Sequence, residues 1–202
     1  DLEVAGKLLD KAGWRATKPG GPRQNRKSEK LVLRFSAVAG IRDIEQLEQL
    51  IQSDLAKIGV ELQIDNKPAK TFFGEFARHR KFPDMSFYAW ISAPDGWSHT
   101  LWQDDYIPSE KNNWQGQNYP GWRNREVTEL LKRVPSEMDA DKRLQLMARV
   151  QELFVDELPA IPMYFRPVVA IATTRLKNYQ PTGTLTPISW NADKWDLEPA
   201  NQ

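Results

Sequence analysis

The stretch LVLRFSAVAGIRDIEQLEQLIQSDLAKIGVELQI, residues 31–64, decides the fold. Apolar side chains alternate over 31–35, which predicts a strand. Over 41–58 the apolar residues recur at helical spacing, and Gly59 stands where that helix is expected to end. Alternation returns over 60–64 and predicts a second strand. Because the joints between these segments are short, the order strand, helix, strand predicts a βαβ unit with parallel strands.

The neighbouring segments extend this unit. Residues 68–80 begin with a proline, which suits a first helical turn, and carry three phenylalanines on one side, so a further helix is expected. The apolar sequence MSFYAWI, residues 85–91, is predicted to be a strand. Upstream, an amphipathic helix is expected over 2–12 and a polar loop over 15–30. The pattern βαβαβ is typical of an α/β lobe.

The second half of the chain has a different character. Residues 92–121 contain several prolines and glycines and little periodicity, and a loop of this length is usually functional. Helices are expected over 127–134 and 140–156. The sequence MYFRPVVAIAT, residues 163–173, is expected to form one or two strands around its proline. From residue 176 onward the sequence is polar, and irregular structure is expected.

Composition limits the chemistry. A chain of 202 residues fits one domain or one lobe of a larger protein. The formal net charge of +1 gives no electrostatic argument for binding nucleic acid. There is no cysteine and there are only two histidines, which excludes thiolate metal sites and thiol nucleophiles. Known nucleophile, zinc-protease, phosphate-loop and dinucleotide motifs are also absent. We therefore expect no enzymatic activity, no cofactor and no metal.

Five of the eight tryptophans lie close together at the end of the third expected strand and in the long loop. They are Trp90, Trp97, Trp102, Trp114 and Trp122. Ligands of parallel α/β sheets bind beyond the carboxyl ends of the strands, and aromatic rings offer large contact areas there. Any single ring has a second interpretation, which is to pack the loop onto the lobe. For the group, we expect at least one ring to line a cleft.

Three aspartates lie in this region, Asp95, Asp104 and Asp105. Asp95 can hold a ligand ammonium group through a charge-assisted hydrogen bond, or it can cap the turn Pro94-Asp95-Gly96. Asp95 together with Asp104 or Asp105 could also form the carboxylate pair of a glycan-acting hydrolase, which gives a less favoured alternative function. Asp104 and Asp105 could also form a cation site, but surface solvation is the favoured interpretation.

Three stretches together resemble one protein family. The first is AGKLLDKAGW, residues 5–14, and the second is IQSDLAKIGVELQI, residues 51–64. The third begins at Trp122 and runs through QELFVDELPAIPMYF, residues 151–165. In this order and spacing they resemble the C-terminal region of the peptide/nickel-type periplasmic solute-binding proteins of ABC importers.

The resemblance implies an architecture and a location. The fold would be an α/β lobe of the periplasmic-binding-protein type II kind, with a mixed, mostly parallel sheet flanked by helices. Residues 1–175 would form the second lobe, and residues 176–202 would be a tail that returns to the first lobe. That first lobe and a signal peptide would belong to sequence upstream of this fragment. The protein would be a monomer in the periplasm, or a lipoprotein on a Gram-positive cell surface, and would dock on ABC permease subunits.

The resemblance also bears on the ligand. Peptide-binding members carry a Trp-x-x-Asp-Tyr segment whose aspartate grips the peptide ammonium group. Here Trp90 matches, but Ala93 stands at the aspartate position and Asp95 lies two residues further on. The ligand is thus expected to be a peptide or another small amphipathic solute, such as a sugar or an opine. The expected ligand-binding residues are Tyr88, Trp90, Ser92, Asp95 and Trp97. A scaffold domain that uses the tryptophan-rich loop to bind proteins remains the alternative.

Overall fold

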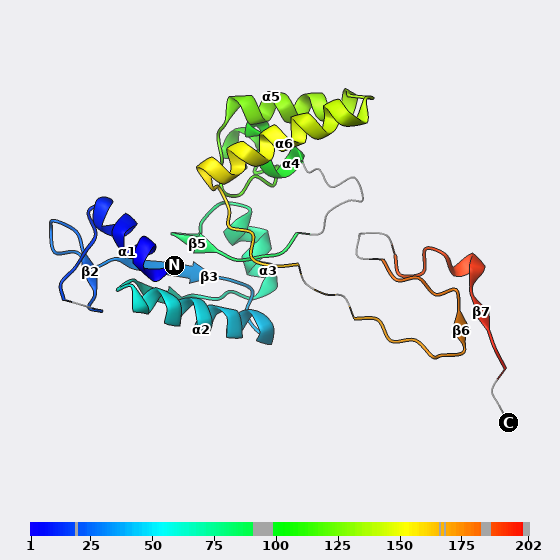
Figure 1. The fold of residues 1–202 in the computed structure, drawn as a ribbon, viewed down its shortest axis with the longest axis horizontal. Coiled ribbons are helices and arrows are strands. Elements are labelled where there is room, and N and C mark those ends of the chain that lie inside the picture. Colours follow the sequence, from blue (N-terminus) through cyan, green and yellow to red (C-terminus); the bar gives the residue numbers. More distant parts are fainter. Residues whose placement is uncertain (19, 91–98, 166, 168, 183–186, 200–202) are drawn as a thin grey trace. The chain divides into compact units, whose positions relative to one another are not determined.

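The computed structural model describes residues 1–18, 20–90, 99–165, 167, 169–182 and 187–199. The chain divides into two compact units. The first contains Asp1–Ala89 and Pro108–Gln115, and the second contains Trp90–Ile107 and Gly116–Gln202. Figure 1 traces the chain in order from blue to red.

A three-stranded parallel sheet forms the centre of the first unit. Its strands are β3 (Val32–Ser36), β4 (Glu61–Ile64) and β5 (Met85–Ser86). The order across the sheet is β4-β3-β5, so β3 is central. Val32 lies opposite Glu61 on one side of β3, and Phe35 lies opposite Met85 on the other. The predicted parallel βαβ unit is therefore confirmed.

Helix α2 (Arg42–Lys57) connects β3 to β4 and covers one face of the sheet. Its residues Ile51 and Leu55 pack against a buried core that contains Phe35 and Leu62. Full burial of side chains such as Phe35 and Leu62 contributes about 1.5–3 kcal/mol each. This packing is what the helical spacing in the sequence predicted.

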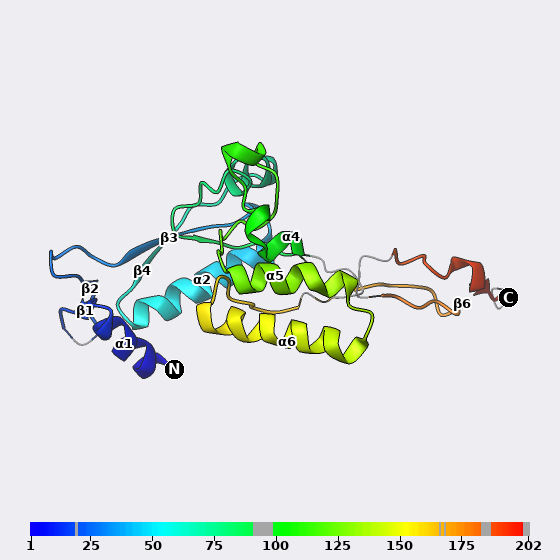
Figure 2. The same cartoon turned by 90° about the horizontal axis from the view of Figure 1, so that it is seen from above.

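The connection from β4 to β5 lies on the other side of the sheet from α2, as both views show (Figures 1 and 2). The chain expected to form one helix over 68–80 forms α3 (Ala69–Thr71) followed by a π-helix, Phe72–Ala77. The prediction of helix was correct, but its regular α geometry was wrong. π-Helical turns are rare and occur frequently at functional sites.

Helix α1 (Leu2–Lys11) confirms the expected first helix and leads into a segment that the sequence analysis treated as loop. This segment contains an antiparallel pair of two-residue strands, β1 (Arg15–Ala16) and β2 (Arg23–Gln24). Strands of two residues have no periodicity to detect, which explains the omission. Gly59, at the predicted end of α2, has a φ of 77°, and a Cβ there would collide with the Gly21 carbonyl.

One side chain of β2 joins three parts of the first unit. Arg23 Nε donates to the carbonyl of Ile58 at 2.7 Å, just after α2. Its Nη1 donates to Asp10 Oδ1 of α1 and to the carbonyl of Trp14, each at 2.6 Å. The Arg23 side chain is only 8% exposed. A guanidinium group can serve these three acceptors at once because its donors form a rigid planar fork.

A buried carboxyl group joins α2 to the sheet. Glu48 is 2% exposed, and its Oε2 accepts a bond from Asn66 Nδ2 at 2.9 Å. Asn66 Oδ1 in turn accepts from the Ala37 amide, just beyond β3. Glu48 Oε1 has no hydrogen-bond partner within the described part of the chain. Burial raises the pKa of Glu48, partly offset by the bond from Asn66.

We expect Glu48→Gln to make the protein more stable near pH 7 and to remove part of its pH dependence. A carboxyl whose folded-state pKa is raised stabilises the fold only while protonated, below the unfolded pKa of about 4.3. That contribution is lost as the pH rises through the raised folded-state pKa. Urea unfolding of both proteins between about pH 4 and pH 7 measures the difference. A difference in free energy of unfolding between Glu48→Gln and the parent that does not increase with pH would contradict this account.

The second unit is built around helices. Helix α5 (Arg125–Arg133) lies beside α6 (Ala140–Glu157) in Figure 2. The core between them contains the following buried residues: Trp122, Val127, Leu131 and Val150. Asp139 caps α6 by accepting bonds from two backbone amides of its first turn. Both predicted helices are confirmed, and their ends lie within about two residues of the expected positions.

Two expectations about strands need correction. Within residues 85–90, the expected strand ends after Ser86, and the Phe87 amide donates one further bond to the Ser36 carbonyl. No strand occurs in the described part of 163–173, where Phe165 and Ile171 are almost fully exposed. β-Branched and aromatic composition favours a strand only where a partner strand supplies the hydrogen bonds.

The tail is more ordered than its polar sequence suggested. β6 (Leu176–Lys177) and β7 (Asp196–Leu197) form an antiparallel pair. Asn191 is 2% exposed, donates to the Asn178 carbonyl and accepts from the Trp195 indole. Side-chain amides thus organise a segment that has little apolar core. Across the described residues, no helix is long and apolar enough to cross a membrane.

Candidate functional site

The sheet topology marks one edge of the first unit as a candidate site. From β3 the chain crosses to β4 on one side, and it then returns past β3 to β5 on the other side. The direction of winding therefore changes between β3 and β5. Ligands of open α/β sheets bind outside the carboxyl ends of strands at this point. Tyr88 follows the end of β5 by two residues, and Trp90 follows it by four.

Tyr88 is half-buried and rests on a cluster of aromatic rings in the first unit. Its ring lies 6.3 Å from that of Phe72, which is fully buried in the π-helix. Phe73 packs edge-on against Phe72 at 5.0 Å and remains 42% exposed. The sequence predicts these phenylalanines on one side of a helix, and they were not among the expected site residues. Their aromatic spacing alone does not distinguish core from cleft.

The carboxyl ends of β3 and β5 also carry two hydroxyl groups. Ser36 and Ser86 lie opposite each other in the ladder. Both Oγ atoms are buried, and neither has a hydrogen-bond partner among the residues that the structure describes. Most buried polar atoms in proteins have a partner, so this end of the sheet keeps unused hydrogen-bonding capacity.

Trp90 belongs to the second unit. Its ring lies 6.0 Å from that of Tyr119, with 30° between the ring planes. Trp90 is 41% exposed, whereas Tyr119 is 9% exposed. A large ring that packs on a buried neighbour and stays open to solvent is a suitable contact surface for a ligand. The other expected ligand-binding residues, Ser92, Asp95 and Trp97, lie outside the described residues and stay predictions.

Three of the clustered tryptophans pack against other aromatic rings. Trp102 and Trp122 pack edge-to-face with each other at 6.2 Å and with Phe154 of α6 at 5.0 and 5.8 Å. The Trp122 indole also donates to Glu157 Oε2 at 2.6 Å. Trp114 packs edge-on against His79 at 4.6 Å in the first unit. These contacts support the packing interpretation for the three rings.

Asp104 and Asp105 are also engaged in structure. Asp104 Oδ1 accepts from the Asn124 amide at 3.1 Å, at the start of α5. Asp105 forms an exposed ion pair with Lys132 at 3.1 Å, and its hydrogen bond raises the pKa of Lys132. In the described part of the chain, no three His, Asp or Glu side chains are grouped to hold a metal ion. Nothing in these contacts favours the hydrolase or cation-site alternatives.

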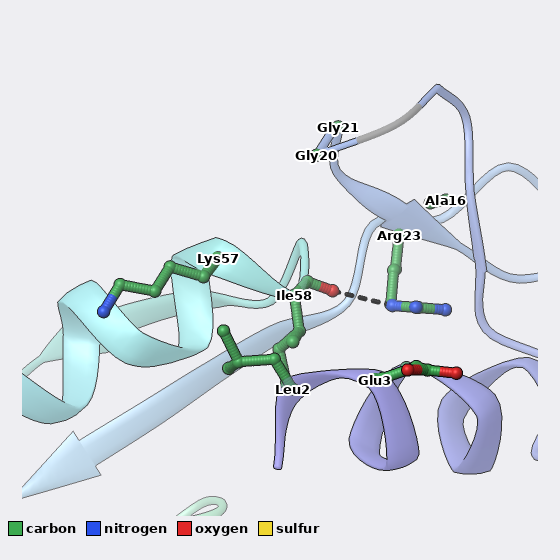
Figure 3. Close-up of a pocket in the computed structure, with 9 residues that line it drawn as sticks. Leu2, Glu3, Ala16, Gly20, Gly21, Arg23, Lys57 and Ile58 are labelled. Carbon is green, nitrogen blue, oxygen red and sulfur yellow. Dashed lines mark hydrogen bonds between the residues drawn. The ribbon is translucent and has the colours of Figure 1, made fainter.

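A hollow of about 250 Å³ lies elsewhere in the first unit (Figure 3). It is lined by residues of α1, β1, β2 and the end of α2, including Glu3, Arg23 and Lys57. The end of α2 leads into the first residue of β4, so the hollow lies near the amino ends of the parallel strands. Figure 3 shows Arg23 bonded to the Ile58 carbonyl. Because ligands of α/β sheets bind at the opposite, carboxyl ends, we assign the hollow to packing around Arg23.

Comparison with known proteins identifies the family. The model of the bacterial extracellular solute-binding proteins, family 5 (middle region), matches residues 1–108, more than half of the chain. The chain belongs to this family. The resemblance seen in the sequence is therefore confirmed.

Individual family members agree with this assignment. OppA, the oligopeptide-binding protein of Mycobacterium tuberculosis, is 25% identical over 181 residues, which are 90% of this chain and 29% of OppA. OppA of Bacillus subtilis is 26% identical over 140 residues, which are 69% of this chain and 24% of that protein. This chain thus spans about a quarter to a third of the length of these family 5 relatives.

A solved structure of an oligopeptide-binding protein extends the comparison to the fold. The protein from Thermus thermophilus, in complex with a pentapeptide, superposes with a TM-score of 0.82 and 31% identity. The superposition covers 98% of this chain and 35% of that chain. The expected type II periplasmic-binding-protein fold, with a parallel sheet flanked by helices, is confirmed.

Proposed function

We propose that this chain is a ligand-binding lobe of a substrate-binding protein that captures peptides for an ABC importer. The single observation that carries the proposal is the match of nearly the whole chain, at 31% identity, to a protein whose complex contains a pentapeptide. The change of winding direction between β3 and β5 supports a ligand site at the carboxyl ends of these strands. Tyr88 and Trp90, two and four residues after the end of β5, would each supply aromatic contact surface.

The mechanism in this proposal is capture without chemical change. Two lobes would close over the ligand, which shifts the population toward the closed form because the closed form makes more contacts with it. Residues 1–175 would belong to one lobe, and residues 176–202 would return to the other. The closed, monomeric protein would then dock on permease subunits outside the cytoplasmic membrane. No catalytic group is assigned, in keeping with a family of solute-binding proteins.

We expect the full-length protein to bind pentapeptides and Trp90→Ala to weaken this binding about tenfold, the effect of removing an aromatic contact residue. Isothermal titration with the tightest pentapeptide from a random library measures the change. Trp190→Ala is a matched control, because Trp190 is 47% exposed and lies in the tail. Equal losses for both variants would sink the assignment of Trp90. Binding of an oligosaccharide in place of every peptide tested would overturn the ligand class.

A further inference from the structure

Tyr119 lies in a short loop, residues 116–122, that is unusually well fixed. Gly116 begins the loop with a φ of 111°, and a Cβ there would collide with the backbone of Tyr106. The Asn118 amide donates to the Tyr106 carbonyl at 3.0 Å. Thr100 Oγ1 donates to Gln117 Oε1 at 2.7 Å. We call these residues the Tyr119 loop.

The centre of the Tyr119 loop is a buried amide side chain. Asn118 is fully buried, and its Oδ1 accepts from the amides of Gly121 and Trp122 at 3.1 and 3.0 Å. Its Nδ2 donates to the carbonyls of Gln103 and Trp122 at 3.2 and 2.9 Å. Four bonds at one side chain hold the loop backbone in a single arrangement. The neighbouring residue Tyr119 is therefore presented from a rigid support.

The Tyr119 ring packs against the ring of Trp90. Trp90 is the one expected ligand-binding residue of the second unit that the structure describes, and its ring is 41% exposed against the nearly buried Tyr119 ring. Ordering a mobile indole on ligand binding costs free energy. A buried ring packed against it reduces that cost in advance.

We propose that Tyr119 is a positioning residue that fixes the orientation of the Trp90 ring for ligand binding. The expected effect of Tyr119 on ligand affinity rests on the proposed function. Its effect on the orientation of the Trp90 ring does not depend on a ligand. The Tyr119 loop thereby contributes to selectivity for ligands with an apolar or planar group to place against Trp90.

The first test uses peptide affinity in the full-length protein. Tyr119→Leu, which keeps most of the buried volume but lacks the planar ring, is expected to weaken binding of the library-selected pentapeptide about two- to tenfold. Tyr119→Phe keeps the ring and is expected to retain affinity. In a Trp90→Ala background, Tyr119→Leu is expected to change affinity little, because the free-energy effects of substitutions at two contacting residues do not add. Unchanged affinity in Tyr119→Leu alone, or an equal loss in both backgrounds, would overturn the proposal.

The second test needs no ligand. The emission of Trp90 is obtained as the difference between each protein and its Trp90→Phe counterpart. Acrylamide is expected to quench this difference signal more strongly in Tyr119→Leu than in the parent, while Tyr119→Phe stays at the parent value. Equal quenching in all three disproves positioning by Tyr119. If the parent protein binds no pentapeptide but quenching changes as expected, the proposed function fails and the positioning of Trp90 stands.

Discussion

Replacing Arg23 by methionine lowers the free energy of unfolding of the first unit by an expected ~3 kcal/mol. The methionine fills similar space but leaves the carbonyls of Trp14 and Ile58 without their buried donor. Asp10 loses its ion pair as well, although it is 54% exposed and keeps its hydration, which limits that part of the loss. The larger part of the effect therefore comes from the two carbonyls.

The measurement is urea unfolding of the full-length protein, with hydrogen exchange to locate the change. Faster exchange is expected in α1 and at the junction of α2 with β4, the segments that Arg23 joins. Arg23→Lys keeps the charge but cannot reach three acceptors with a single ammonium group, so an intermediate loss is expected. Arg26→Met, on the exposed part of the same segment, serves as the control and should change stability by no more than about 0.5 kcal/mol. If Arg23→Met changed the free energy of unfolding as little as this control does, the hydrogen bonds of Arg23 would not stabilise the first unit.

Local patterns in the sequence predicted the centre of the first unit correctly. The apolar residues alternate over 31–35 and 60–64 and recur at helical spacing between them. These periods reflect which face of each element is buried, so the order of apolar residues in the sequence predicts them. The π-helix was missed because six residues are too few to separate its period from that of an α-helix. The one or two strands expected over 163–173 do not occur in the described part of that segment, because strand formation depends on a partner strand, which no local pattern contains.

The candidate site was predictable only in part. Tyr88 and Trp90 were expected because they follow an apolar strand, where parallel sheets bind ligands. Tyr119 was missed because a single aromatic residue in a loop has no periodic neighbours, and its contact with Trp90 joins positions far apart in the chain. Arg23 was missed for a related reason, since it was counted among the solvated basic residues of a polar loop. Long-range partners decide the roles of such residues.

The largest loss of stability is expected for Asn118→Leu, about 3–5 kcal/mol in the second unit. Leucine is close to asparagine in size but offers no hydrogen bonds. The amide and the carbonyl of buried Trp122 would lose the Asn118 side chain as their partner. The Gly121 amide keeps its bond to the Asn118 carbonyl, and the Gln103 carbonyl keeps its bond from the Tyr106 amide. Each buried group that loses its partner costs about 1–3 kcal/mol.

The effects of Asn118→Leu should extend from the Tyr119 loop to the helical core of the second unit. Trp122 belongs to the core beside α6, so the near-ultraviolet circular dichroism of its ring cluster is expected to weaken together with protection of α5 from hydrogen exchange. Gln151→Leu is the matched control, because it makes the same kind of amide-to-leucine change on an exposed face of α6. Should Asn118→Leu unfold at the same urea concentration as this control, the four bonds of Asn118 do not hold the Tyr119 loop. The inference that Asn118 gives Tyr119 a rigid support would then fail. A large destabilisation confined to the second unit would instead show that the buried Asn118 amide makes the loop rigid.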